Sequence, residues 1–147
     1  MTIHAPTGSG LKDWIEVGSV NIYGEYPSIL ALDNTIYATD GNKMCITKPG
    51  GDKPTTIALP RIQLEGGPET ANWNLCCIDP SGSIIVCEQM SGHVYLYRDG
   101  KGFQRIQFGK VGSDLEEPTQ VLPDSEGHLW IHEQTIYGTL LSCFTRP

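Results

Sequence analysis

A short pattern that occurs three times limits what this 147-residue chain can fold into. In the middle copy, residues 78–88, the turn Asp79-Pro80-Ser81-Gly82 separates two apolar runs, and the second run ends on Glu88. Related stretches at residues 32–40 and 124–133 place aspartates 46 residues before and 45 residues after Asp79. A period of this size indicates a fold assembled from copies of one supersecondary unit.

Each copy belongs to a unit of short segments with a period near two, which is typical of β-strands. The 17 glycines and 10 prolines suit strands joined by tight turns, and no segment keeps a helical stripe over eleven residues. The expected strands are 28–32, 35–39, 43–47 and 55–59 in the first unit, 75–78, 83–87, 93–97 and 103–108 in the second, and 119–122, 128–131 and 139–144 in the third. The third unit is therefore one strand short.

The composition excludes several classes of partner. A net charge of -7 without a lysine-arginine cluster predicts no nucleic-acid binding, because the phosphate backbone would be repelled. No apolar run approaches the roughly 18 residues that span a membrane, so no membrane partner is expected. No secretory signal is visible at the start. Five unevenly spaced cysteines without a Cys-x-x-Cys pair predict reduced thiols and a cytoplasmic protein.

Four consecutive antiparallel strands per unit of this length are typical of a β-propeller blade. The repeated pattern joins a proline, a turn aspartate and glycine, an apolar-aromatic pair and a closing acid. It resembles the blades of the NHL, SMP-30 and streptogramin-lyase group, which implies an all-β fold of four-stranded blades. The residues that carry it are Pro118, Asp124, Gly127, Leu129, Trp130 and Glu133, and Pro27, Asp33, Ile36, Tyr37 and Asp40. The second unit has Trp73 in place of the proline, and the first lacks the turn glycine.

The strand that the third unit lacks is expected at the N-terminus. Residues 8–18 match residues 99–109 in pattern, with a glycine turn, alternating apolar residues and a closing glycine. Propellers close in this way, because the first strand of the chain completes the last blade and removes its open edge. We expect one half-propeller domain, 1–147, with a closing strand at 8–18 and blades at 27–59, 73–108 and 118–145.

Three blades are fewer than the four to eight of stable propellers, whereas two copies give six. The sequence therefore predicts a homodimer that forms one six-bladed propeller, in which the N-terminal strand with Trp14 completes the third blade of the other copy. Two alternatives remain: the chain is half of a longer protein, or it pairs with a different three-blade partner.

In related propellers, ligands bind where the loops from fourth to first strands meet the turns between second and third strands. We call this side the loop face. It supplies the candidate ligand-binding residues Tyr26, Glu69, Trp73, Asn74, Glu88, Glu117, Gln120 and Glu133.

The repeated acids and Trp73 each allow both a structural and a functional interpretation. Asp40, Glu88 and Glu133 end equivalent strands, so they either hold a hard cation such as calcium or magnesium, or bond the backbone N–H groups of the next turn. Trp73 is either a platform for a sugar or a packing residue at the position where the other blades have proline.

The resemblance also suggests chemistry. SMP-30-like lactonases hold a metal with Glu, Asn and Asp, and Glu69, Asn74 and Asp40 have these residue types without a match of position. The streptogramin-lyase resemblance makes His132 an acid or base, whereas a lone histidine at a strand end is otherwise structural. His132 and Glu69 are the catalytic candidates if the protein is an enzyme. No cofactor is predicted apart from such a divalent cation.

The expected function is a non-catalytic homodimer that binds a protein, small-molecule or glycan ligand through the loop face and the channel mouth. The alternatives are a metal-dependent hydrolase or lyase of the SMP-30 or streptogramin-lyase type, and a small propeller lectin.

Overall fold

The structure is a computed structural model that describes residues 2–6, 14–19, 28–48, 53–62, 72–108 and 115–145. These residues form strands and turns without any helix, so no helix among them could cross a membrane. The strands are β1 (Thr2–Pro6), β2 (Trp14–Ser19), β3 (Ile29–Leu32), β4 (Thr35–Asp40), β5 (Lys43–Thr47), β6 (Thr55–Ala58), β7 (Trp73–Ile78), β8 (Ile84–Glu88), β9 (His93–Arg98), β10 (Gly102–Ile106), β11 (Pro118–Pro123), β12 (Leu129–Thr135) and β13 (Gly138–Phe144). The all-β class is confirmed, and every strand predicted for the three units is present.

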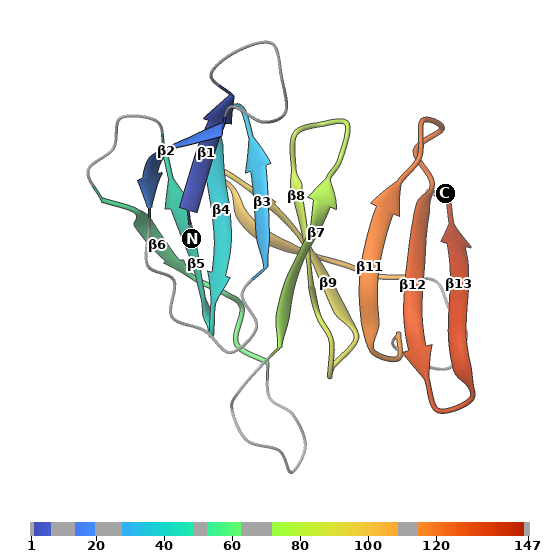
Figure 1. Cartoon of the computed structure of the whole chain (residues 1–147). Helices are drawn as coiled ribbons and strands as arrows, with labels where there is room; N and C mark the ends of the chain where they lie inside the picture. The colour runs from blue at the N-terminus through green and yellow to red at the C-terminus, as the bar shows by residue number, and fades with distance from the viewer. Residues whose placement is uncertain are drawn as a thin grey trace.

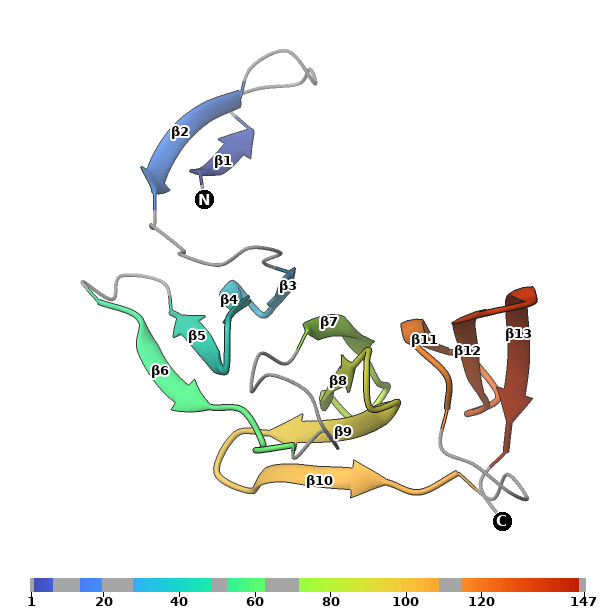
Figure 2. The same cartoon turned by 90° about the horizontal axis from the view of Figure 1, so that it is seen from below.

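Three antiparallel sheets carry the repeat. Blade 1 has the order β3-β4-β5-β6, blade 2 the order β7-β8-β9-β10, and blade 3 the order β11-β12-β13. The first strands β3, β7 and β11 lie nearest to one another, and the later strands of blades 1 and 2 spread outward (Figure 2). Blade 3 has three strands, as the sequence predicts.

The repeated aspartates form the hairpins between the first and second strands. In blade 1, Asp33 and Asn34 link β3 to β4 with φ of 48° and 60°, a conformation that asparagine and aspartate tolerate better than most residues. Blade 2 uses a glycine instead: the N–H of Gly82, with φ of 78°, donates to the Asp79 carbonyl over 2.9 Å. The absence of a turn glycine in the first unit therefore leaves the hairpin intact.

Two apolar layers between the blades form the core. Tyr37 and Met44 of blade 1 pack with Val86 of blade 2, and Ile85 of blade 2 packs with Ile131 of blade 3. Strand β8 is buried on both faces because it has a blade on each side. Its run Ile84–Glu88 is accordingly apolar without alternation until its last residue.

The N-terminal region forms a separate hairpin. Strand β2 pairs with β1 from Thr2 opposite Ser19 to Pro6 opposite Trp14. The predicted closing strand thus appears at Trp14–Ser19, its first part lies outside the described residues, and the partner β1 was not predicted. Among the described strands, the hairpin contacts neither blade 3 nor any other sheet, and it stands on the side of the molecule away from β11–β13 (Figures 1 and 2).

Candidate functional site

Glu88 fixes one part of the loop face. Its side chain is fully buried at the end of β8, and Oε1 accepts hydrogen bonds from the N–H of Asn72 over 2.8 Å and of Met90 over 3.3 Å. Oε2 accepts from the N–H of Ser91 over 2.7 Å. Asn72 precedes β7 and Ser91 lies in the next turn, so one carboxylate joins the incoming loop to the turn between the second and third strands. This contact agrees with the capping interpretation of Glu88.

Glu133 has the same place in blade 3. It is fully buried, Oε1 accepts the N–H of Glu116 over 2.8 Å, and Oε2 accepts the hydroxyl of Ser142 over 3.5 Å. Gln134 adds a backbone bond to the Glu117 carbonyl over 3.1 Å. The acid therefore holds the loop that leads into β11. A ligand-binding role for Glu88 and Glu133 stays a prediction, since both carboxylates face protein.

Blade 1 achieves the same connection with hydroxyl groups. Thr39 Oγ1 accepts the N–H of Ser28 over 2.9 Å, and the N–H of Thr39 donates to the Ser28 carbonyl over 3.0 Å. The Ser28 hydroxyl then accepts the N–H of Leu75 from blade 2 over 2.7 Å. Asp40, the acid expected here, is half-buried beside this contact at the end of β4.

Trp73 lies in the core. Only 2% of the residue is exposed, and its ring packs against Tyr95 with centroids 5.7 Å apart in the layer between blades 1 and 2. Its indole Nε1 is buried without a hydrogen-bond partner among the described residues. This environment is that of a packing residue at the start of β7 and leaves no open ring face for a sugar.

The remaining candidates are dispersed. Glu117 and Gln120 are exposed at the start of β11, and Asn74 is half-buried in β7. Tyr26 and Glu69 lie outside the described residues. Within the part of the chain that the structure describes, no three histidine, cysteine or acidic side chains are grouped as a metal ion requires, so the set of Asp40, Glu69 and Asn74 stays a prediction.

His132 contacts its own blade. Its Nδ1 is hydrogen-bonded to the hydroxyl of Thr119, which also donates to the His132 carbonyl over 3.2 Å. In the strand register His132 is opposite Gln120 and Leu141, so two predicted residues, His132 and Gln120, are neighbours. The histidine belongs to the side face of blade 3 rather than to its turns.

The sequence did not single out Tyr137 and Ile136, the two most exposed apolar residues of the loop face. Tyr137 and Ile136 are 94% and 87% exposed in the turn between β12 and β13, and Met90 is 61% exposed in the equivalent turn of blade 2. Their signal in the sequence is an apolar residue within a predicted turn, where polar residues are expected.

At the opposite end of the strands, the aspartate turns are closed by their own hydrogen bonds. Asp124 Oδ2 accepts from His128 Nδ1 over 2.8 Å and from Trp130 Nε1 over 3.1 Å, while Oδ1 accepts the N–H of Glu126 and of His128. Partial burial opposes ionisation, but these donors outweigh it and hold the pKa of Asp124 well below its usual value. This turn therefore has a structural role.

Two thiols join blade 2 to blade 3, and a third lies beside them. Cys77 donates to the Val121 carbonyl over 2.8 Å, and Cys87 to the Pro118 carbonyl over 3.3 Å. Burial raises the pKa of Cys77 to about 12. The Sγ atoms of Cys76 and Cys87 are 3.2 Å apart, and this hydrogen bond lowers the pKa of Cys76 and raises that of Cys87. All five cysteines of the chain are free thiols.

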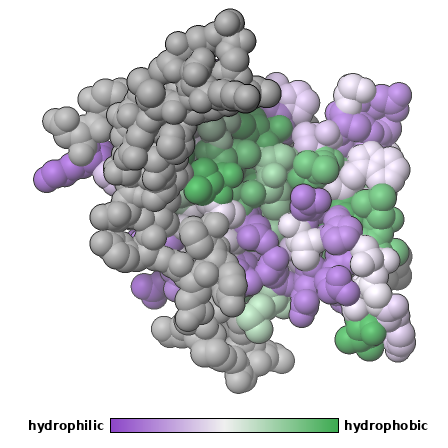
Figure 3. All heavy atoms as spheres, in the orientation of Figure 1, coloured by the Kyte–Doolittle hydropathy of each residue, from purple (hydrophilic) through white to green (hydrophobic). Residues whose placement is uncertain are grey.

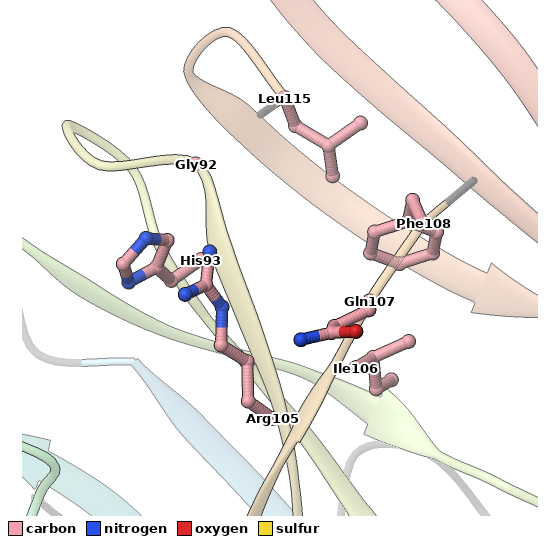
Figure 4. Close-up of a pocket in the computed structure, with 7 residues that line it drawn as sticks. All are labelled: Gly92, His93, Arg105, Ile106, Gln107, Phe108 and Leu115. Carbon is pink, nitrogen blue, oxygen red and sulfur yellow. The ribbon is translucent and has the colours of Figure 1, made fainter. Parts of the chain in front are cut away.

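A hollow of about 220 Å³ opens where β9 begins and β10 ends (Figure 4). Its polar lining residues are His93, Arg105 and Gln107, and none of the predicted ligand-binding residues lines it. Gly92 closes one side with φ of 71°, and a Cβ there would lie 1.8 Å from the carbonyl oxygen of Leu115. This glycine is required for the close approach of the two blades.

Solved structures with a similar fold include three lyases. A streptogramin B lyase is 17% identical with a TM-score of 0.55, and the match covers 87% of this chain and 43% of that one. A catalytically inactive virginiamycin B lyase from Staphylococcus aureus, crystallised with quinupristin, is 18% identical with a TM-score of 0.60, covering 99% of this chain and 49% of that one. A selenomethionine-substituted virginiamycin B lyase from the same species is 17% identical with a TM-score of 0.53, covering 82% and 41%. The chain is built of β-propeller blades.

The chain spans less than half of the length of these structures, and at this level of identity the likeness concerns the fold. No protein-family model matches the sequence. No curated protein matches it either.

Proposed function

We propose that this chain is a non-catalytic binding protein, that two copies form one ring of blades, and that its loop face takes a protein or small-molecule ligand. The observation that carries this proposal is the exposure of Tyr137, Ile136 and Met90 at the tips of equivalent turns, 94%, 87% and 61% respectively.

Exposed apolar side chains at adjacent turns are characteristic of a surface that binds another molecule. Exposed polar residues near the start of β11 and the end of β12 provide a polar rim of the kind that such surfaces have. Large apolar anchors favour a protein ligand over a sugar. The exposed polar residues are Glu116, Glu117, Gln120 and Gln134.

The environment of the acids supports a function without catalysis. Glu88 and Glu133 are fully buried and accept backbone N–H groups, so their charge is used to hold loops in place. The Nδ1 atom of His132 is hydrogen-bonded to the hydroxyl of Thr119 on the neighbouring strand of the same blade. These contacts favour structural roles for the three residues.

The free thiols support a cytoplasmic location. Five cysteines without a disulfide suit a reducing compartment, and Cys77 and Cys87 each use the thiol as a hydrogen-bond donor between blades. Oxidation would remove these donors.

The binding surface can be tested with a random-peptide display library selected against the purified protein. We expect peptides whose affinity falls at least about tenfold in the Ile136→Ala/Tyr137→Ala chain, because a few exposed anchors carry most of the binding energy. The control is Lys101→Ala, which changes an exposed residue in the turn between β9 and β10 at the other end of the strands.

Two results would contradict the proposal. Turnover of quinupristin by the wild-type chain, lost in His132→Ala, would make the protein a lyase. Binding on a glycan array that survives the Ile136→Ala/Tyr137→Ala change and is lost in Glu117→Ala would make it a lectin.

A further inference from the structure

The two side faces of each blade differ in what they pack against. Tyr37 of blade 1 packs in the layer shared with blade 2, and Ile85 of blade 2 packs in the layer shared with blade 3. Both residues therefore face the blade that follows in the chain. Trp130 is the equivalent residue of blade 3, since Ile85 and Trp130 each come six residues after the turn aspartate. Tyr37 is 9% exposed and Ile85 is fully buried, whereas Trp130 is 40% exposed.

Trp130 belongs to an exposed apolar sheet face. In the strand register it is opposite Leu122 on one side and Cys143 on the other, and Leu141 lies two residues from Cys143. Leu122 is 49% exposed, Leu141 is 61% exposed, and Cys143 is exposed as well. We call these four residues the open face. In blades 1 and 2, the equivalent face is buried against the next blade.

Blade 1 has a side face that no other blade covers. Ile29, Ala38 and Cys45 lie opposite one another in its register, next to Ala31 opposite Ile36. Ile29 is 49% exposed. Apolar atoms gather over the part of the molecule where Figure 1 places β3 (Figure 3). Of its two alanines, Ala31 is exposed and Ala38 is buried, so the exposed part of this face lies along β3.

Two strand edges are also open among the described residues. Strand β13 pairs with β12 only, whereas the third strands of blades 1 and 2 are covered by β6 and β10. Strand β2 pairs with β1 on one edge and with no other described strand. The two strands have similar lengths, six residues in β2 and seven in β13. An uncovered edge of this kind accepts another strand.

We infer that the open face of blade 3 is the docking surface for blade 1 of a second copy, and that β2 of that copy pairs with β13 as its fourth strand. This inference rests on the homodimer of the proposed function and specifies its interface. Within the chain, blade 1 packs against blade 2 and blade 2 packs against blade 3. The inferred interface continues this series with the contact between blade 3 and blade 1 of the second copy. A second copy also supplies both missing elements together, because β2 leads directly into blade 1.

The repeat predicts the register of the added strand. Residues 8–18 correspond to 99–109, so Ile15 corresponds to Ile106, which is opposite Val94 in blade 2. Val94 is opposite Cys87, and Leu141 is opposite His132, the residue equivalent to Cys87. Ile15 of one copy should therefore lie opposite Leu141 of the other.

A disulfide trap tests this register. In a Cys143→Ser background, Ile15→Cys with Leu141→Cys should form a covalent dimer under mild oxidation, which a thiol reductant reverses. The control Glu16→Cys with Leu141→Cys moves the new thiol one position along the strand, to the alternate face, and should stay uncross-linked. Mass spectrometry should find residue 15 joined to residue 141 between two chains.

A second pair of variants tests the open face. Trp130→Glu should weaken association at least about a hundredfold, since it places a charge where a blade packs. Ile136→Glu introduces the same charge at an apolar position of the loop face and should leave association unchanged. Sedimentation measures both.

Failure of the inference is distinct from failure of the proposed function. A wild-type dimer without the cross-link would overturn this interface and leave the homodimer in place. Trp130→Glu sedimenting like the wild-type dimer would also overturn it. Neither measurement uses a ligand, so peptide binding tests the function independently.

Discussion

Blades 2 and 3 have the same internal design and different surroundings. Each begins its hairpin with an aspartate and has, at or near the end of its second strand, a fully buried glutamate that holds the incoming loop. Blade 2 lies between two neighbours, and Ile85 is fully buried, whereas Trp130 at the same position of blade 3 is 40% exposed. The repeat thus determines where a side chain lies in its blade, and a neighbouring blade determines whether it is buried.

The largest loss of stability should come from truncating a side chain that is fully buried between two blades. Ile85→Ala should lower the free energy of unfolding by about 2–5 kcal/mol, because it leaves a cavity between blades 2 and 3. Urea denaturation measures this change. Ile136→Ala, at an 87% exposed position, should change stability by less than about 0.5 kcal/mol. Equal effects of the two substitutions would mean that the layer between blades 2 and 3 does not stabilise the fold.

A smaller loss of stability is expected when the buried glutamate of blade 2 or of blade 3 is replaced. Glu88→Gln should cost about 1–3 kcal/mol, because an amide has only one oxygen to accept three backbone N–H groups that are otherwise buried. Glu133→Gln should also lower stability, since this buried carboxylate accepts the N–H of Glu116 and the hydroxyl of Ser142. Thermal unfolding compares the two with the exposed control Glu117→Gln. Losses no larger than that of Glu117→Gln would contradict the structural role of the two buried acids.

The smallest change in stability should come from Asp124, in the turn between β11 and β12, and it should depend on pH. The pKa of Asp124 is lowered in the folded state, so its ionised form stabilises the protein above the unfolded pKa of about 3.9. This contribution declines as the pH falls below that value towards the folded pKa. Asp124→Asn should therefore be less stable than the wild type at pH 7, and the difference should shrink in acid.

Urea midpoints of wild type and Asp124→Asn between about pH 5 and pH 2 test the sign of this effect. A difference that grows as the pH falls would contradict the hydrogen-bonded carboxylate. The matched variant Asp79→Asn changes the equivalent turn of blade 2, where Oδ1 accepts the N–H of Ser81 and of Ser83 over 2.9 Å each.

The strands could be predicted because short-range signals specify them. Asp33-Asn34 and the turns that begin at Asp79 and Asp124 separate apolar runs, and tight turns between such runs give antiparallel hairpins. The recurrence of Glu88 and Glu133 also indicated structural roles, which their backbone contacts fit. Strand β1 could not be foreseen, because Thr2–Pro6 is short and ends in a proline that opposes strand formation.

Burial was harder to foresee than strand position. Trp73 begins a strand beside polar residues, and only the contact between blades 1 and 2 places its ring in the core. The approach of Cys76 to Cys87 depends on the irregular register between Leu75 and Cys77, which alternation along the strand does not predict. The exposure of Tyr137 depends on the length of the β12–β13 hairpin, whose strands extend beyond their predicted ends.

The mass of the wild-type chain in solution tests the central claim most directly, namely that a second copy covers the open face of blade 3. Sedimentation equilibrium at micromolar concentration should give twice the 16.1 kDa of one chain. A single species of 16.1 kDa at that concentration would contradict the account, because Trp130 and Leu141 would then remain exposed in the working protein.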